Sequence, residues 1–178
     1  MKMDEFYNKL FEFVPDFDLN RKNSPILIAT PNSKDRGKTT SLKFLILVLS
    51  DFNENNVKYV YGDPQFASIL NVSSGGTPSN GWLSKIIQPL GQRQYDLSVV
   101  ITLNFQDGNQ IKVGISTHGD IASMMEDFLC AGSGGSILKS DFKDCQVIFS
   151  ACHGCGHESY KKLEAICKAN SISICNIR

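Results

Sequence analysis

A lysine and two threonines stand together at Lys38, Thr39 and Thr40, directly after Gly37. A lysine ammonium group can bind the terminal phosphates of a polyphosphate, and a threonine hydroxyl can ligate the accompanying Mg²⁺. The second threonine can contact an inner phosphate, and the glycine lets the main chain approach a phosphate without a side-chain clash. These residue types therefore predict a site that binds phosphate groups.

The segments on either side could position such a site. Ile26–Ala29 is a short apolar run typical of a buried strand, and Ser41–Leu49 reads as an apolar helix. Backbone N–H groups of the polar loop between them can point at an anion, and the helix dipole adds positive potential there. The sequence thus predicts a strand, a phosphate-binding loop and a helix. The alternative is an ordinary strand–turn–helix in which Lys38 and Thr39 only begin the helix.

This arrangement resembles the Walker A motif of the P-loop NTPases, written G-x-x-x-x-G-K-[ST] between a strand and a helix. Asn32 stands where the first glycine belongs, and asparagine tolerates positive φ better than most residues. The resemblance implies that the loop binds ATP or another nucleoside triphosphate together with Mg²⁺. The residues that would form it are Asn32, Ser33, Lys34, Asp35, Arg36, Gly37, Lys38, Thr39 and Thr40.

Hydrolysis or transfer of a phosphoryl group also needs an acid near the metal, and we assign Asp120 to that task beside Thr39. Asp120 precedes the apolar helix Ile121–Leu129, so the alternative is a helix N-cap. In the same loop, His118 could orient water or donate to a phosphate oxygen, because its pKa lies near neutrality. A solvated loop histidine is the alternative. Lys38, Asp120 and His118 are thus the predicted catalytic residues.

A further carboxylate, Asp63, follows the strand-like run Val57–Tyr61. It could ligate Mg²⁺ or contact an acceptor substrate. As the alternative, Asp63 only forms the turn before Pro64. The predicted metal ligands are therefore Thr39, Asp120 and Asp63.

The segment before Asp120 looks like the switch region of the small GTPases, where a hairpin is followed by a polar loop and a helix. That family carries Asp-x-x-Gly at this place, whereas this chain reads Thr117-His118-Gly119-Asp120. No Asn-Lys-x-Asp motif follows Phe149 either. Guanine specificity is therefore unsupported, and ATP is the expected nucleotide.

Two cysteines and two histidines lie close together at Cys152, His153, Cys155 and His157. Such ligands at short spacing could bind zinc, and a Cys-x-x-Cys pair could also be redox-active. We favour a glycine-rich loop after a strand, because no second Cys-x-x-Cys exists to complete a zinc site.

Strands that alternate with helices predict a three-layer α/β fold, with helices on both faces of a mostly parallel sheet. The runs Asp96–Phe105 and Gln110–Ser116, joined by a turn that contains Asp-Gly, predict a hairpin that adds one antiparallel strand. Ligands bind beyond the carboxyl ends of the strands in such sheets. The loops expected on the nucleotide side are those after Ala29, Tyr61, Ser116 and Ser150.

Other segments complete this fold. A helix over Met3–Val14 is expected to pack on the sheet, with a partner-binding arm as the alternative. Ser73–Gly81 is interpreted as a surface loop, anchored by the tryptophan that begins a short amphipathic helix at Trp82–Leu90. A lid or base-stacking platform is the alternative. The remaining predicted elements are a strand at Asp144–Ser150, a helix at Glu158–Asn170 and a strand at Ser171–Ile177.

Composition favours one globular domain over residues 1–178, with residues 1–24 as an N-terminal helix and lead-in. Apolar residues make up 42% of the chain and the net charge is zero, so no broad attraction to nucleic acid or to a membrane is expected. We recognise no N-terminal signal and no apolar run of membrane-spanning length. The six cysteines suit reduced thiols, so a cytoplasmic location is expected.

These observations lead to three functional hypotheses. The first is a Mg²⁺-dependent hydrolase of nucleoside triphosphates that uses ATP in preference to GTP. The second is a small nucleotide or metabolite kinase, and the third is a nucleotide-sensing regulator with little turnover. A protein partner or a homo-oligomer is left open in each.

Overall fold

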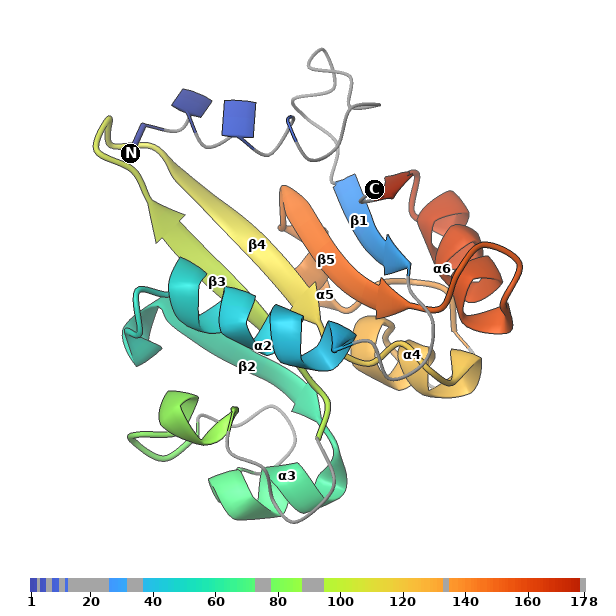
Figure 1. Cartoon of the computed structure of the whole chain (residues 1–178), viewed down its shortest axis with the longest axis horizontal. Helices are drawn as coiled ribbons and strands as arrows, with labels where there is room; N and C mark the ends of the chain where they lie inside the picture. The colour runs from blue at the N-terminus through green and yellow to red at the C-terminus, as the bar shows by residue number, and fades with distance from the viewer. Residues whose placement is uncertain are drawn as a thin grey trace.

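Six strands form one mixed β-sheet at the centre of the molecule (Figure 1). The structure is a computed structural model that describes residues 1–2, 4–5, 8–9, 12, 26–31, 37–72, 78–87, 95–132 and 135–176, with the side chains of residues 30 and 31 left out. The strands are β1 (Ile26–Pro31), β2 (Val57–Gly62), β3 (Leu97–Asn104), β4 (Gln110–Ser116), β5 (Val147–Cys152) and β6 (Ser173–Asn176).

The strand order is β2-β3-β4-β5-β1-β6, and β3 alone runs against its neighbours. The predicted α/β class and the β3–β4 hairpin are therefore confirmed. Because β3 is reversed, its first residue lies at the edge where β2 and β4 end. Five strands thus bring their carboxyl ends, and β3 brings its start, to the same edge of the sheet.

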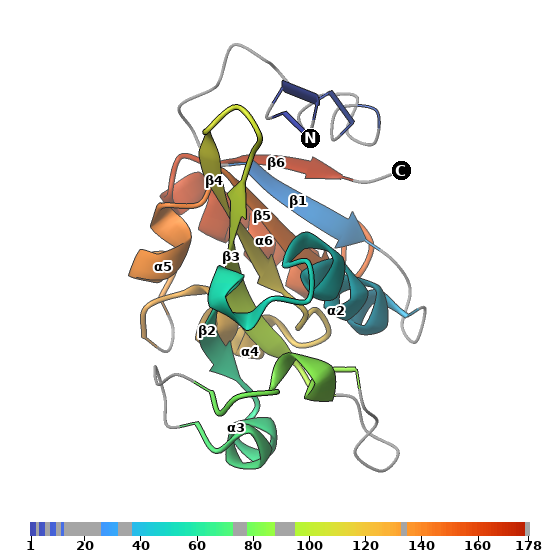
Figure 2. The same ribbon diagram turned by 90° about the vertical axis from the view of Figure 1, so that its left-hand side faces the viewer.

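Helices cover both faces of the sheet (Figures 1 and 2). One face carries α2 (Lys38–Leu49), α3 (Pro64–Leu70) and the 3₁₀ turn η3 (Leu83–Lys85), and a second 3₁₀ turn, η2 (Glu54–Asn56), precedes β2. The other face carries α4 (Ala122–Leu129), α5 (Ser140–Lys143) and α6 (Glu158–Ala169). The short helix α5 was not predicted, and β5 begins later than expected as a consequence.

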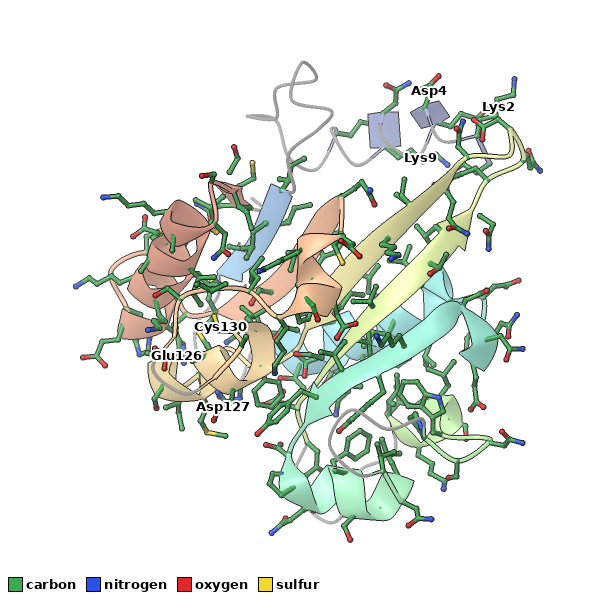
Figure 3. The ribbon with its side chains drawn as sticks, turned by 180° about the vertical axis from the view of Figure 1, so that it is seen from behind. Lys2, Asp4, Lys9, Glu126, Asp127 and Cys130 are labelled. Atoms are coloured by element: carbon green, nitrogen blue, oxygen red, sulfur yellow. The ribbon has the colours of Figure 1, made fainter. Side chains whose placement is uncertain are left out.

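Strand β1 shows why the sheet needs both helical layers. Ile26 and Ile28 pack in the core cluster on the α2 side, whereas Leu27 and Ala29 pack in the cluster on the α6 side. Successive side chains of a strand point to opposite faces, so a run without polar residues is stable only when both faces are covered. On the second face, α4 and α6 are also joined by an ion pair between Glu126, labelled in Figure 3, and Lys162.

The segment after residue 81 differs from the prediction. A single 3₁₀ turn at Leu83–Lys85 stands in place of the expected amphipathic helix, as far as the described residues reach. The carboxylate of Glu54 accepts the backbone N–H groups of Gly81 and Leu83 at 3.0 and 3.1 Å, which fixes a tight turn. Trp82 is 2% exposed, so it is a core residue and offers no face for base stacking.

Several predicted segments lie wholly or partly beyond the described ranges. Most of Met3–Val14, residues 73–77 and residues 88–90 lie outside the described residues. None of the helices within the described ranges combines the length and apolarity that crossing a bilayer requires.

Candidate functional site

Polar side chains from five strands meet at the edge where the carboxyl ends gather. This is the edge at which ligands bind in open α/β sheets. The loop after β1 leads into α2, the loops after β4 and β5 approach the same helix, and β3 contributes the residue before its start. The residues concerned are Gly37, Lys38, Thr39, Asp63, Asp96, Thr117, His118, Asp120 and His153.

Gly37 is the N-cap of helix α2, and its backbone is left-handed, with φ 75° and ψ 14°. A Cβ atom at Gly37 would meet nothing within 4 Å, so glycine is favoured here by backbone conformation and not by crowding. The cap has no side-chain hydrogen bond, and the first turn of α2 holds no acidic residue. Since the first amides of a helix have no partner inside it and carry positive potential, this end suits an anion.

Thr39, on the first turn of α2, reaches the carboxylate of Asp96. Its hydroxyl lies 3.2 Å from Oδ1 of Asp96 and 3.3 Å from the carbonyl oxygen of Thr117. The hydroxyl of Thr117 donates to the same Oδ1 atom at 2.8 Å and accepts the backbone N–H of Leu97 at 3.0 Å. The start of β3, the end of β4 and the start of α2 are thereby joined through one carboxylate.

The second oxygen of Asp96 is bound by His118. Nδ1 of His118 lies 2.9 Å from Oδ2 of Asp96, and Nε2 of the neutral ring accepts the backbone N–H of Ile121 at 3.4 Å. The ring is 5% exposed and stacks on Phe128, with 4.9 Å between ring centroids. The alternative of a solvated histidine is therefore wrong. Both ring nitrogens already have partners within the protein. His118 would therefore act on a ligand indirectly, by holding Asp96 in place.

Charge pairing shifts the pKa values of both groups. Burial alone would raise the pKa of Asp96, but the hydrogen bond and charge of His118, with the hydroxyls of Thr117 and Thr39, hold that pKa below its usual value. Burial alone would lower the pKa of His118, but the hydrogen bond and charge of Asp96 outweigh burial and raise it. An ionised carboxylate and a readily protonated imidazole therefore stabilise each other at this edge.

Asp63, the residue after β2, binds the main chain of Asp96. Its Oδ2 atom accepts the N–H of Asp96 at 2.8 Å, and its own N–H donates to the carbonyl of Asp96 at 3.0 Å. Burial first, and then the charge of Asp96, raise the pKa of Asp63. Lys43, which is 4% exposed on α2, has its pKa lowered by burial against the attraction of both carboxylates. Asp63 is thus a positioned carboxyl group and more than a turn former.

Asp120 occupies a different part of the edge. Its Oδ1 atom lies 3.9 Å from Nζ of Lys38 and 3.3 Å from Nε2 of His153. The Asp120 side chain is 54% exposed, whereas that of Lys38 is 7% exposed. The N-cap of α4 is Ile121 and has no side-chain capping bond, so the alternative of Asp120 as a cap is wrong.

Gly119 lets the loop after β4 approach β5 closely. A Cβ atom at Gly119 would lie 2.5 Å from the carbonyl carbon of Ala151 and 2.7 Å from the backbone nitrogen of Cys152. No side chain fits in that space. The close approach of the two backbones brings Asp120, which follows β4, against His153, which follows β5.

The side chains of the Cys/His loop, residues 152–157, do not gather into a metal site. The described residues include no group of three or more His, Cys, Asp or Glu side chains that could hold a metal ion. Burial raises the pKa of the Cys152 thiol to about 12, while Cys155 is exposed. His157 accepts the backbone N–H of Ser159 at 3.2 Å and so caps α6. Only His153 reaches the candidate site.

Of the predicted site residues, Lys38, Thr39, His118, Asp120 and Asp63 all lie at this edge. Thr40 is half-buried on the first turn of α2, and residues 32–36 of the predicted loop lie outside the described residues. Sequence reasoning assigned no role to Asp96, Thr117 or Lys43, and it considered His153 only as a possible zinc ligand. The signal for Asp96 was present, because an acidic residue at the start of the one antiparallel strand must share the edge with the carboxyl ends of the others.

No protein-family model, curated protein or solved structure matches this chain.

Proposed function

We propose that this protein binds nucleoside triphosphates at the start of α2 and hydrolyses them with Mg²⁺, using ATP in preference to GTP. The observation that carries the proposal is the pairing of Thr39 with Asp96 directly after Gly37 and Lys38. A hydroxyl held by a carboxylate at the start of a helix is what a metal–phosphate complex requires. The resemblance of residues 32–40 to a Walker A motif supports the same conclusion.

The donor set at this edge fits Mg²⁺. Hydroxyl and carboxylate oxygens are the ligands that this ion prefers, and nucleotide-bound Mg²⁺ needs only one or two of them from the protein. The Thr39 hydroxyl would ligate the ion, and the Asp96 carboxylate, which accepts a hydrogen bond from that hydroxyl, would hold it in place. When bound, Mg²⁺ supplies positive charge to the phosphate oxygens. Lys38, the residue before Thr39, would supply a second positive charge. The backbone amides at the start of α2 would add positive potential from the helix dipole.

We assign Asp120 the role of orienting the water molecule that attacks the phosphate. It is the exposed member of a short chain that runs from Lys38 through Asp120 to His153. A carboxylate that is accessible and also oriented by a histidine can accept a hydrogen bond from water and hold it toward a phosphate. His118 acts in this scheme as a positioning residue, since it holds Asp96 and does not face solvent.

Titration calorimetry with ATP and GTP in the presence of Mg²⁺ tests the binding step. Lys38→Ala should weaken nucleotide binding by at least about tenfold, because it removes a charge-assisted contact to phosphate. Lys112→Ala is the matched control, because Lys112 pairs with Asp144 on the surface at 3.5 Å and should leave affinity unchanged. If Lys38→Ala binds both nucleotides as tightly as the parent protein, the proposal is wrong.

Phosphate release then separates the three hypotheses. Release from ATP without any acceptor identifies a hydrolase, release or transfer only with an acceptor identifies a kinase, and binding without turnover identifies a sensor. In a hydrolase, Asp120→Asn should reduce turnover and leave nucleotide affinity nearly unchanged, since the carboxylate acts on water and not on the phosphates. Unchanged turnover in Asp120→Asn would remove that residue from the mechanism.

A further inference from the structure

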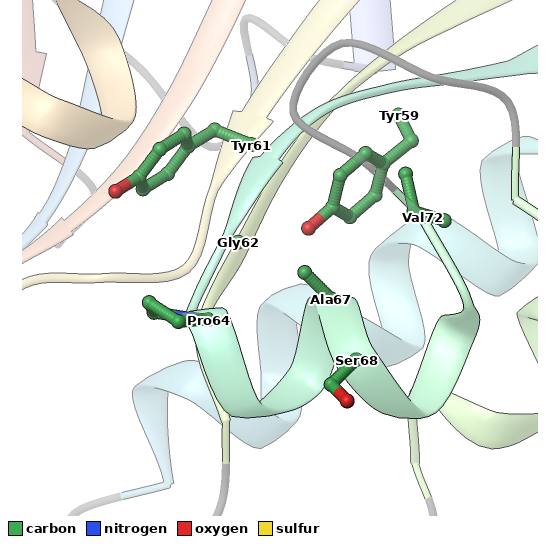
Figure 4. Close-up of a pocket in the computed structure, with 7 residues that line it drawn as sticks. All are labelled: Tyr59, Tyr61, Gly62, Pro64, Ala67, Ser68 and Val72. Carbon is green, nitrogen blue, oxygen red and sulfur yellow. The ribbon is translucent and has the colours of Figure 1, made fainter.

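A pocket of about 380 Å³ lies between the end of β2 and α3, next to the candidate site. Figure 4 shows the rings of Tyr59 and Tyr61 on opposite sides of the β2 ribbon, with α3 below both. Asp63, which binds Asp96, stands between two of the lining residues in the sequence. The residues that line the pocket are Tyr59, Tyr61, Gly62, Pro64, Ala67, Ser68 and Val72.

The hydroxyl of Tyr59 is a buried polar group at this pocket. Tyr59 is 4% exposed, and its hydroxyl has no hydrogen-bond partner within the described part of the chain. In Figure 4 the hydroxyl points toward Gly62 and Ala67. A Cβ atom at Gly62 would lie 2.3 Å from the hydroxyl oxygen, so a side chain there would occupy its place. A buried hydroxyl without a partner is costly, and a ligand that binds it removes that cost.

The walls of the pocket define the chemistry of such a ligand. Tyrosine, proline, alanine and valine side chains provide apolar and aromatic surface, which suits a flat ring. Among the described residues that line the pocket there is no lysine, arginine, aspartate or glutamate. Burial first, and then Tyr61, raise the pKa of Tyr59 to about 12, so the hydroxyl is neutral. Burying a charged ring costs far more than burying a neutral one, and Asp63, whose charge acts on Tyr59, would repel an anionic ring.

We propose that this pocket binds an uncharged, nucleobase-like heterocycle that hydrogen-bonds to the Tyr59 hydroxyl. The proposal goes beyond the phosphate site at α2 and does not depend on it, because a ligand of this class carries no phosphate. The ring could come from a free nucleoside or from the base of a bound nucleotide. The volume is within the range of small-molecule sites, at its lower end, and accommodates one such ring.

Nucleosides without phosphate are the probes: adenosine, guanosine, cytidine and thymidine, each titrated into the full chain by calorimetry. Trp82 provides a local readout, because it is the only tryptophan in the sequence and its ring stands edge-on to Tyr59 with 6.0 Å between centroids. At least one nucleoside should bind and change the Trp82 fluorescence at the same midpoint. Absence of binding by all four nucleosides overturns the proposal.

Two variants locate the binding. Tyr59→Phe removes one hydroxyl and should weaken the nucleoside about three- to tenfold, the worth of one net hydrogen bond. The same change should not lower the stability of the free protein, because the hydroxyl that it removes has no partner within the described residues. Ala67→Leu fills the pocket from α3 and should abolish binding. Tyr160→Phe is the matched control, since the Tyr160 hydroxyl accepts the Asn176 amide at 2.9 Å away from the pocket.

Nucleoside affinity equal to that of the parent in both Tyr59→Phe and Ala67→Leu would overturn the proposal. Lys38→Ala should bind the nucleoside normally, which separates a failure at this pocket from a failure of the phosphate site.

Competition by ATP identifies the source of the ring. If ATP displaces the nucleoside from the parent protein, the ring is the base of the nucleotide, and if both bind together, it belongs to a second ligand.

Discussion

Asp96 is the residue on which the candidate site depends most. Its two carboxylate oxygens bind Thr39 and Thr117 on one side and His118 on the other, and its main chain binds Asp63. Removing one partner of a buried charged pair leaves the other uncompensated, which costs more than the pair itself contributes. The position of the Thr39 hydroxyl, and with it the proposed Mg²⁺ ligand, is therefore set by residues far away in the sequence.

The Asp96–His118 pair predicts how stability depends on pH. The pKa of His118 is raised above 6.5 in the folded protein, so its contribution is complete below that value and is lost as pH rises through the folded pKa. The pKa of Asp96 is lowered below 3.8, so its contribution is present above 3.8 and is lost as pH falls through the folded pKa.

Urea denaturation from pH about 5.5 to about 8.5 measures the alkaline side of this dependence. The free energy of unfolding of the parent protein should fall across that range, and His118→Gln should be less stable at the acid end and show a flatter profile. His157→Gln is the control, because His157 caps α6 and has no contact with Asp96. Equal slopes in parent and His118→Gln would contradict the pairing.

At the scale of elements, the loop between β4 and α4 places Asp120 beside His153 because its backbone approaches the end of β5 closely. Gly119 permits that approach, since its missing side chain leaves room for the backbone of Ala151 and Cys152. The consequence extends to the candidate site. Asp120 and His153 come from loops that follow neighbouring parallel strands, and only this contact brings their side chains to 3.3 Å.

Gly119→Ala should therefore destabilise the protein by about 1–3 kcal/mol, the usual effect of forcing an extra methyl group into packed structure. It should also reduce nucleotide turnover, because Asp120 moves away from Lys38 and His153. Gly154→Ala is the matched control, since a Cβ atom at Gly154 would meet nothing within 4 Å. Urea denaturation and phosphate release measure the two effects, and a Gly119→Ala protein that matches Gly154→Ala in both would contradict this account.

At the scale of the whole molecule, one sheet separates two apolar clusters. The cluster on the α2 side includes Trp82 and Ile46, and the cluster on the α6 side includes Leu163 and Phe142. Both clusters take alternate residues from the same strands, so neither helical layer can detach without exposing a face of the sheet. The two faces should accordingly unfold together.

Leu163→Ala tests this coupling. Leu163 is fully buried in α6, and truncating it should lower the free energy of unfolding by about 2–5 kcal/mol. Trp82 lies on the opposite face, so its fluorescence should report the same lowered midpoint as circular dichroism does. Ser84→Ala, at an exposed position on η3, is the control for the fluorescence signal. Separate midpoints for the two signals would show that the layers unfold independently.

The sequence by itself determined the local parts of this protein. The apolar run before the loop, the glycine that caps α2 with the lysine that begins it, and the Asp-Gly hairpin all depend on neighbours a few residues apart, and these three features formed close to their expected places. The order of strands with helices also predicted the α/β class and the edge that gathers Lys38, Thr39, Asp63, His118 and Asp120.

Only the tertiary structure decided which of these side chains meet. Thr39 and Asp96 are 57 residues apart, and their pairing depends on the reversed direction of β3. Asp120 faces His153 because β5 lies beside β4 and Gly119 permits close contact. Contacts of this kind follow from strand order and from how closely two backbones approach, and residue spacing along the chain does not reveal either. The sequence therefore predicted one partner of each pair, Thr39 and Asp120, and the fold supplied the other.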